Sequence, residues 1–205
     1  MFTCFGYGSL VNTDTLAPGT RAVRVRVTGW RRAWRHSGLT AFGRRCTLTV
    51  YSDPESAIDG VVIAQPVDTL PALDQREGQY TRHAVDAGAL EWLDARPDGW
   101  PDPFVYVGNT EHRRPGDADH PIMLSYLDVV IAGFLRTFGA SGANHFLKTT
   151  DDWHVPVLND RAAPRYPRAL SLSPGERGQV DRCLEELAVI PIQACPQPSS
   201  VSATR

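Results

Sequence analysis

The chain has 205 residues, of which 42% are hydrophobic and 21% charged, and its formal net charge is −2 at pH 7. This length supports one full hydrophobic core, and the composition is that of a globular protein rather than a disordered one. A slightly acidic chain lacks the basic surface that favours nucleic acid, and no apolar run approaches the roughly 18 residues of a membrane span. We therefore expect no nucleic-acid or membrane partner, one domain over residues 1–190, and a frayed polar tail over 191–205.

The cysteine and histidine patterns argue against a metal site. Cys4, Cys46, Cys183 and Cys195 form no C-x-x-C pair and no zinc-like spacing, and the six histidines show no H-x-H or H-E-x-x-H pairing. The first residues lead directly into a predicted strand, without the basic and apolar regions of a signal peptide. We expect a cytoplasmic protein with free thiols and without a metal or cofactor.

The first two-thirds of the chain is predicted to form mostly strands. Residues 21–30 alternate valine with arginine, and this period of two indicates a half-buried strand. Four further segments are rich in β-branched or aromatic residues: 45–53, which ends at an Asp-Pro turn, 57–67, 80–87 and 104–109. Between them, residues 70–79 carry leucines three apart, which predicts one or two helical turns that end at Gly78.

The last third is predicted to be helical. Residues 120–139 contain Pro121 near a helix start and Gly139 at a suitable C′ position. The capping-box pattern at 173–176 predicts a second helix over about 174–188, and the proline-rich stretch 150–170 between the helices predicts an irregular arm. Strands followed by helices favour the α+β class, with a mixed, mainly antiparallel sheet curled into a small barrel packed with helices.

Two short motifs contain the candidate chemistry. In F-G-Y-G-S-L, residues 5–10, two glycines flank Tyr7 at the end of a predicted strand. Glycine permits a close approach, and unpaired N–H groups in such a turn can bind an anion; the alternative is an ordinary strand-to-turn junction. In L-D-Q-R-E-G-Q-Y, residues 73–80, Glu77 precedes Gly78 at a helix end, where a solvated carboxylate is the alternative.

Together with G-W-R-R-A-W at residues 29–34, these motifs resemble the gamma-glutamylcyclotransferase superfamily over roughly residues 2–139. In that family a Y-G-S loop and a downstream E-G line one pocket in a small mixed barrel. The resemblance implies an enzyme whose small gamma-glutamyl substrate is cleaved by its own α-amine, which attacks the γ-carbonyl. The products are 5-oxoproline and an amine or amino acid, and no metal, cofactor or covalent enzyme intermediate is implied.

The resemblance also implies roles for residues of the two motifs. Glu77 is the candidate catalytic residue, which takes a proton from the substrate's α-ammonium and returns it to the leaving amine. Because glutamate is a weak base at neutral pH, this role calls for a buried carboxyl. The loop around Tyr7, Gly8, Ser9 and Leu10 would bind the substrate's α-carboxylate or the developing oxyanion.

Four more residues are candidates for substrate binding, and some have a second interpretation. Tyr80 brings a hydroxyl close to Glu77, whereas Tyr106 and Tyr126 either line the pocket or belong to the core. Arg82 either meets a substrate carboxylate or is an exposed strand arginine. We further expect Arg82, with the Arg31–Arg32 pair, to border the leaving-group side of the pocket, where an arginine would favour gamma-glutamyl peptides over gamma-glutamyl amines.

Other functions are weighed against this one. The serine at residue 9 does not stand in a G-x-S-x-G nucleophile elbow, and the third glycine of a dinucleotide site is missing. The remaining rival is a non-catalytic module that binds gamma-glutamyl or amino-acid-like ligands on the same fold. Within the enzyme hypothesis, the glutathione-specific branch, the general branch, gamma-glutamyl amines and a gamma-glutamyl biosynthetic intermediate all stay open.

Overall fold

The computed structural model describes residues 1–40 and 43–193, so Cys195 and most of the predicted tail lie outside the described residues. Within these ranges the helices are α1 (Leu70–Arg76), α2 (Leu124–Lys148) and α3 (Pro174–Glu186). The strands are β1 (Phe2–Gly6), β2 (Ala22–Thr40), β3 (Gly43–Gln65), β4 (Tyr80–Ala84), β5 (Leu90–Trp92), β6 (Phe104–Gly108), β7 (Ile122–Met123), β8 (Thr150–Asp151), β9 (Val157–Asn159) and β10 (Ile192–Gln193). Short 3-10 turns are η1 (Ser9–Val11), η2 (Thr13–Thr15), η3 (Val67–Thr69), η4 (Ala87–Ala89) and η5 (Thr110–His112).

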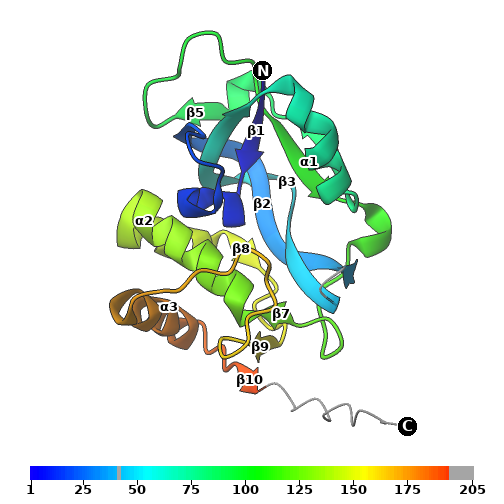
Figure 1. The fold of residues 1–205 in the computed structure, drawn as a ribbon, viewed down its shortest axis with the longest axis vertical. Coiled ribbons are helices and arrows are strands. Elements are labelled where there is room, and N and C mark those ends of the chain that lie inside the picture. Colours follow the sequence, from blue (N-terminus) through cyan, green and yellow to red (C-terminus); the bar gives the residue numbers. More distant parts are fainter. Residues whose placement is uncertain (41–42, 194–205) are drawn as a thin grey trace, which may run out of the picture.

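The sheet is built on the long antiparallel hairpin of β2 and β3, which bends at two register shifts within β2. One half of the hairpin carries the strand order β5-β2-β3-β1-β6-β4. In the other half of the hairpin, β2 pairs with β8. On its other side β3 pairs with β7, and the sheet continues through β9 to β10. Figure 1 shows the hairpin running between these two halves, with the N-terminus at one end of the molecule.

The α+β class and the mainly antiparallel sheet are confirmed, but the predicted barrel is wrong because the sheet is not closed. Among the described residues its strand path ends at β4 and at β10, which do not pair with each other. Closure needs a continuous stagger around one cylinder. Here the two halves of the bent hairpin pair with different sets of short strands, so each half of the sheet has its own unpaired edges.

The Asp-Pro turn predicted at the end of 45–53 is also absent, since β3 continues through it to Gln65. Residues 53–56 lie opposite the single residue Gly29, between the pairs Thr28↔Ala57 and Trp30↔Ser52. Gly29 has a positive φ of 80°, which glycine adopts readily. Pro54 has no N–H to donate, and it is tolerated because this bulge interrupts the ladder.

Helix α2 starts later and ends later than its sequence pattern indicates. Pro121 precedes the short strand β7, and α2 begins at Leu124, where the Asp160 carboxylate accepts a hydrogen bond from Ser125 N (2.7 Å). Gly139 does interrupt the helix, with φ 70° and ψ −171°, but the chain then resumes helical geometry up to Lys148. The resumed part buries apolar side chains, so tertiary packing extends the element beyond its local stop signal.

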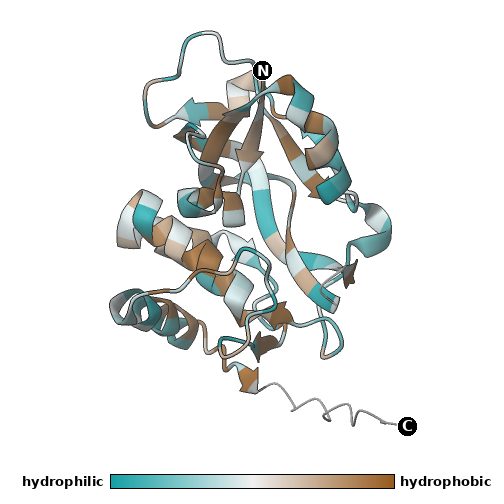
Figure 2. Ribbon diagram, in the orientation of Figure 1, coloured by the Kyte–Doolittle hydropathy of each residue, from teal (hydrophilic) through white to brown (hydrophobic). Residues whose placement is uncertain are grey.

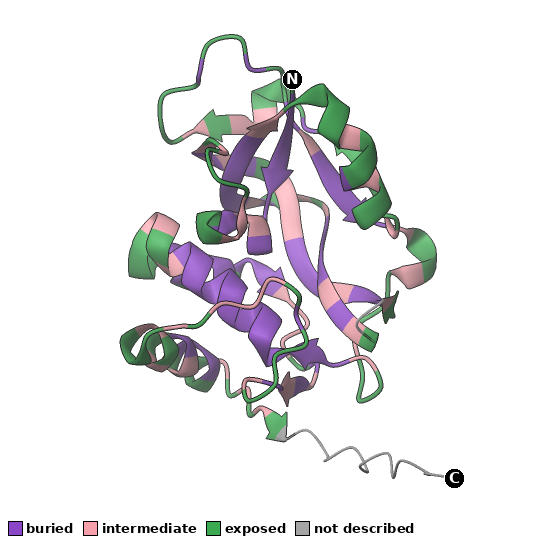
Figure 3. Ribbon diagram, viewed as in Figure 1, coloured by how far each residue is buried: buried purple, intermediate pink, exposed green. Residues whose placement is uncertain are grey.

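The core lies between α2 and the sheet. Most of α2 is buried, whereas α3 exposes one face on the outside of α2 (Figure 3). Figure 2 shows brown, apolar residues along β1 and the middle of α2, where the core lies, and mostly teal residues along α3. Trp34, Phe134 and Phe146 are among the largest fully buried side chains. None of the described helices has both the length and the apolar character required to cross a membrane.

The capping box predicted at the start of α3 is confirmed. Ser173 Oγ accepts from Glu176 N (3.3 Å), and Ser173 N donates to Glu176 Oε2 (2.9 Å). The same carboxylate accepts from Arg136 of α2, whose Nη2 lies 2.6 Å from Glu176 Oε1. The cap therefore both starts α3 and joins it to α2.

A glycine where β3 lies against the end of β1 provides a test of this packing. A Cβ at Gly60 would lie 2.4 Å from Gly6 O and 2.5 Å from a Phe5 ring carbon, so we expect Gly60→Ala to lower the free energy of unfolding by about 1–3 kcal/mol. The matched control is Gly175→Ala in α3, where a Cβ meets no atom within 4 Å and should be neutral or stabilising. Urea unfolding measures both, and equal stability of the two variants would contradict the close approach of Gly60 to Phe5 and Gly6.

Candidate active site

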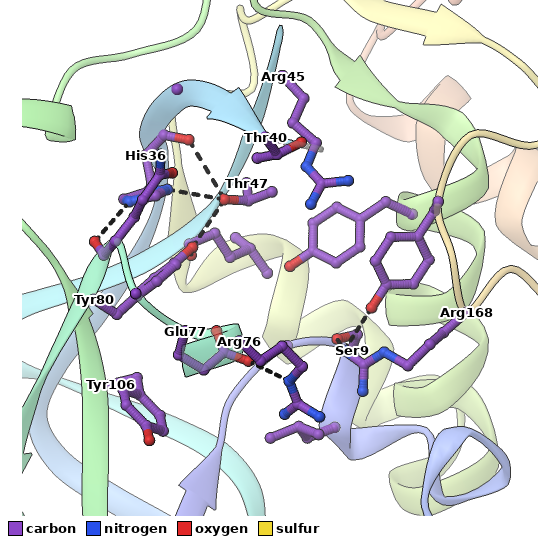
Figure 4. Close-up of a pocket in the computed structure, with 18 of the residues that line it drawn as sticks. Ser9, His36, Thr40, Arg45, Thr47, Arg76, Glu77, Tyr80, Tyr106 and Arg168 are labelled. Atoms are coloured by element: carbon purple, nitrogen blue, oxygen red, sulfur yellow. Dashed lines mark hydrogen bonds and ion pairs between the residues drawn. The ribbon is translucent and has the colours of Figure 1, made fainter. Parts of the chain in front are cut away.

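A cavity of about 420 Å³ lies where the end of β1, the β2–β3 hairpin, the end of α1 and the arm after β9 meet (Figure 4). It brings together eight of the nine site residues predicted from the sequence: Tyr7, Gly8, Ser9, Leu10, Glu77, Tyr80, Tyr106 and Tyr126. The two candidate motifs are far apart in the sequence, and the fold places both on this one cavity.

The Tyr7–Leu10 loop forms one wall. The first hydrogen bond of turn η1 runs from Val11 N to Gly8 O (3.0 Å), so the N–H groups of Ser9 and Leu10 have no acceptor inside the turn. Gly8 leaves room beside them, because a Cβ there would lie 3.3 Å from Leu48 Cδ1 and 3.4 Å from Tyr126 Oη. The loop therefore presents backbone to the cavity where a larger residue would fill the space.

A fully buried arginine holds this loop from behind. Arg32 Nε donates to Tyr7 O (2.8 Å), Nη1 donates to Thr149 Oγ1 (2.9 Å), and Nη2 donates to the Asp59 carbonyl. The C=O of Tyr7 and the N–H of Gly8 belong to one trans peptide and point in opposite directions. Because Arg32 lies in the core, the Gly8 N–H is directed away from the core.

The Arg32 guanidinium also lies over two aromatic rings, 4.9 Å from the Phe134 centroid and 5.3 Å from the Phe146 centroid. Burial lowers the pKa of Arg32 to about 9, so it stays charged at neutral pH. Its neighbour Arg31 instead forms an ion pair with Asp151 (2.8 Å). The prediction that Arg31 and Arg32 border the leaving-group side is therefore wrong: neither residue lines the cavity.

Glu77 caps the end of α1 and turns its carboxylate to the cavity. Its N–H donates to Leu73 O (2.9 Å), its carbonyl accepts from Tyr80 N (2.7 Å), and Oε1 accepts from Arg76 Nε (3.0 Å). The side chain keeps 25% of its surface exposed. The carboxyl is thus half-buried and paired with a cation, rather than buried as its proposed role led us to expect.

Tyr80 and His36 form a second wall, with their rings stacked at 4.2 Å. Tyr80 Oη donates to Leu48 O (3.0 Å) and lies 2.8 Å from Thr47 Oγ1, which in turn lies 3.1 Å from His36 Nδ1. Burial lowers the pKa of His36 to about 4, so the ring is neutral at physiological pH. Sequence reasoning did not single out His36, because an isolated histidine on a strand gives no signal of a pocket.

The tyrosines predicted for the site contribute hydroxyl groups rather than anions. Burial raises the pKa of Tyr7, Tyr80 and Tyr126 well above 10, so each stays protonated at neutral pH. Tyr7 Oη donates to Tyr106 O (2.8 Å), and Tyr106 Oη donates to Asp74 Oδ1 (2.7 Å). Tyr106 and Tyr126 each line the cavity and also pack in the core, so the two open interpretations of these residues both hold.

Arg82 does not line the cavity. Its Nε lies 3.2 Å from Asp74 Oδ1, and its guanidinium lies 5.4 Å from the Phe104 ring centroid. In the β4–β6 register Arg82 pairs with Tyr106. Its side chain is held by Asp74 of α1 and by Phe104, the first residue of β6. This ion pair and aromatic contact explain why the side chain does not reach the cavity.

Different arginines line the cavity in place of the expected ones. They are Arg45 on β3, Arg76 on α1 and Arg168 in the arm after β9. With Glu77 as the one carboxylate among the described lining residues, the charged lining is mainly cationic. Arg168 lies in the proline-rich stretch without periodicity, where no sequence signal pointed to a binding residue.

The described residues contain no cluster of three or more histidine, cysteine or acidic side chains arranged to hold a metal ion. Cys4, Cys46 and Cys183 are free and buried in the described part of the chain. Burial raises the pKa of Cys4 to about 12 and that of Cys46 to about 11, which keeps both thiols protonated and unreactive.

No protein-family model matches the sequence, and no curated protein matches it significantly. Among solved structures, one named gamma-glutamyl cyclotransferase superposes with a TM-score of 0.58 at 15% identity, over 88% of this chain and 98% of that one. The chain has the gamma-glutamyl cyclotransferase fold. An uncharacterised human protein has the same coverage, with a TM-score of 0.56 at 16% identity. YkqA from Bacillus subtilis gives 0.52 at 16% identity, over 72% of this chain and 53% of that one.

The neighbouring arginines of the R-R motif provide a matched test of the loop clamp. We expect Arg32→Met to lower the free energy of unfolding by at least about 2 kcal/mol, because three buried acceptors lose their donor. Arg31→Met removes a more exposed ion pair and should cost less than about 1 kcal/mol. Chemical denaturation compares the two, and equal losses would show that Arg32 is not the clamp.

Proposed function

We propose that this chain is a gamma-glutamylcyclotransferase, which converts a gamma-glutamyl amide into 5-oxoproline and an amine or amino acid in the cytoplasm. One observation carries the proposal: the Tyr7–Leu10 loop and Glu77 line a single cavity within the gamma-glutamyl cyclotransferase fold. A polar loop on one wall and a carboxylate on another are the two groups that the cyclisation requires. The fold alone would not support this activity. The support comes from the position of these residues around one cavity.

The proposed reaction begins with proton transfer from the substrate's α-ammonium to Glu77. The freed amine attacks the γ-carbon, and its nitrogen loses a second proton as the ring amide forms. The amide C–N bond breaks as Glu77 delivers a proton to the leaving nitrogen. Atoms balance without water, because the attacking nitrogen gives up two protons and the leaving nitrogen takes up two and departs as an ammonium. Holding the substrate curled would supply several kcal/mol through orientation, since the nucleophile and the carbonyl belong to one molecule.

The loop and the tyrosines complete this proposal. The Ser9 and Leu10 amides, with the outward N–H of Gly8, are suited to bind negative charge on the substrate's carboxylate or on the developing oxyanion. Protonated tyrosine hydroxyls can orient substrate oxygens without adding a competing negative charge. Arg76 holds Glu77 in place before the substrate's ammonium arrives.

The ion pair of Arg76 and Glu77 also favours a second candidate function. A carboxylate already paired with an arginine is less available as a base, and it can still bind the ammonium of an amino acid. A non-catalytic module for gamma-glutamyl or amino-acid-like ligands would have this arrangement. Calorimetric binding without 5-oxoproline formation would identify it.

A substrate panel tests the activity and selects the compound. Purified protein is incubated with glutathione, gamma-glutamyl amino acids and gamma-glutamyl amines, and 5-oxoproline is measured by mass spectrometry. Turnover of glutathione alone would indicate the glutathione-specific branch, and turnover of several peptides the general branch. Absence of 5-oxoproline across the panel would reject the proposed activity.

Replacement of the candidate base tests its role. We expect Glu77→Gln to lower kcat about 10²- to 10⁴-fold, because the amide cannot accept the proton while its shape is nearly the same. Glu55→Gln, at an exposed site on β3 away from the cavity, is the matched control and should keep wild-type activity. Steady-state kinetics on folded variants decides the matter, and a near-wild-type kcat for Glu77→Gln would remove this residue from the mechanism.

The loop is tested by filling its open space. We expect Gly8→Val to lower kcat/KM more than Ser9→Ala does, because a branched side chain would project toward Leu48 and Tyr126 into the substrate's place. Ser9→Ala removes one hydroxyl and leaves the backbone amides. Circular dichroism confirms that both variants fold, and a larger loss for Ser9→Ala would restore a side-chain role for this serine.

A further inference from the structure

The arm after β9 places a cation directly beside the Tyr7–Leu10 loop. Arg168 lines the cavity, and its Nη2 donates to Ser9 Oγ at 2.9 Å. Figure 4 shows the two side chains together, on the same side of the cavity as Arg76 and Glu77. The loop that is proposed to bind negative charge therefore has a guanidinium next to it, contributed by a residue 159 positions away in the sequence.

The charge of Arg168 is not balanced by an acidic side chain. Its Nη2 also donates to Tyr166 Oη at 2.6 Å, and both of its observed hydrogen-bond partners are neutral hydroxyls. Within residues 1–40 and 43–193, no carboxylate contacts Arg168, and its Nε and Nη1 have no acceptor. Arg161 in the same arm, by contrast, pairs with both Asp128 and Asp181 at 2.6 Å.

The arm is fixed, so Arg168 is held ready to bind. The buried Asp160 carboxylate accepts from Ser125 N (2.7 Å), Ser125 Oγ (2.6 Å) and Arg165 N (2.8 Å). Ser125 Oγ in turn accepts from Tyr166 N (3.2 Å), which ties the arm to the start of α2. The Tyr166 ring packs 4.9 Å from the Tyr126 ring and lies under the Arg168 guanidinium. Such prior fixation reduces the entropy lost on binding.

We propose that Arg168 binds the α-carboxylate of the substrate's glutamyl group. The inference rests on the proposed function and names the residue that recognises this carboxylate. An α-amino acid carries its ammonium and carboxylate on one carbon, so the two charges need opposite partners close together. Glu77 provides the negative partner, while Arg168, with Ser9, provides the positive one on the same side of the cavity.

The leaving group's carboxylate is the competing assignment. Figure 4 shows Thr40 and Arg45 across the cavity from Ser9 and Arg168, so a leaving group that extends away from the loop would approach that side. Arg168 is joined to the loop itself by its bond to Ser9. The position next to the loop therefore assigns Arg168 to the glutamyl end of the substrate.

Three matched substrates separate these assignments. They are gamma-glutamylalanine, its analogue with the glutamyl α-carboxylate converted to a carboxamide, and gamma-glutamylethylamide, which lacks only the leaving group's carboxylate. We expect Arg168→Gln to lower kcat/KM about 10- to 100-fold for the first and third, because both keep the α-carboxylate. The carboxamide analogue should change less than about twofold, and Arg168→Lys should recover part of the loss.

The test stays valid even if the variant is less stable, because a loss of folded protein lowers kcat/KM equally for all three substrates. Equal losses for all three would indicate a structural role, and a loss confined to gamma-glutamylalanine would assign Arg168 to the leaving group; either result overturns the proposal. Arg165→Gln is the matched control, because its side chain is exposed and outside the cavity lining and its N–H bond to Asp160 does not depend on the side chain. It should match the wild type on every substrate.

A binding measurement distinguishes failure of this proposal from failure of the proposed function. Calorimetric titration with L-glutamate and with isoglutamine, its α-carboxamide, does not depend on turnover. We expect the wild type to bind glutamate about tenfold or more tightly than isoglutamine, and Arg168→Gln to lose that preference. If the wild type shows no preference, or if the variant keeps it, the assignment of Arg168 is wrong even where 5-oxoproline is formed.

Discussion

The candidate site depends on the buried guanidinium of Arg32. Its three hydrogen bonds join the end of β1 at Tyr7, the middle of β3 at Asp59 and the end of α2 at Thr149. Burying a charge is costly unless its donors are satisfied, and here the donors meet buried oxygens while Phe134 and Phe146 cover the cation. Because Tyr7 leads directly into the loop, the core fixes the direction of the loop peptides before any ligand binds.

A second anchor holds the arm that lies beside this loop. Asp160 bonds to Ser125 at the first turn of α2 and to the arm, so one carboxylate both caps a helix and positions the segment that carries Tyr166 and Arg168. Two firmly held segments, the loop and the arm, therefore line the cavity side by side. Its mainly cationic lining contrasts with the negative charge of the whole chain and suits a small anionic ligand.

Much of the local structure could be predicted from the sequence. The valine–arginine alternation of β2, the capping box at Ser173 and the helical turn before Glu77 each depend on neighbours within a few residues. The element boundaries that were predicted wrongly depend on residues that are far away in the sequence. Pro54 is accommodated because β3 bulges there, opposite Gly29 of β2, and α2 continues beyond Gly139 because its last turns have a buried face. Closure of the sheet likewise depends on strand partners that no local pattern specifies.

By itself, the sequence identified the segments that meet at the candidate site: the glycine-flanked tyrosine loop, the glutamate at a helix end and three further tyrosines all line one cavity. Only the tertiary structure decided which arginines join them. Arg32 and Arg82 have the same side chain as Arg168, yet one is enclosed in the core and the other pairs with Asp74. The alternation of residues along a strand indicates which side chains share a face, and it does not indicate what packs against that face. The charged lining therefore depends on long-range pairing, since a strand, a helix end and an irregular arm meet there only after folding.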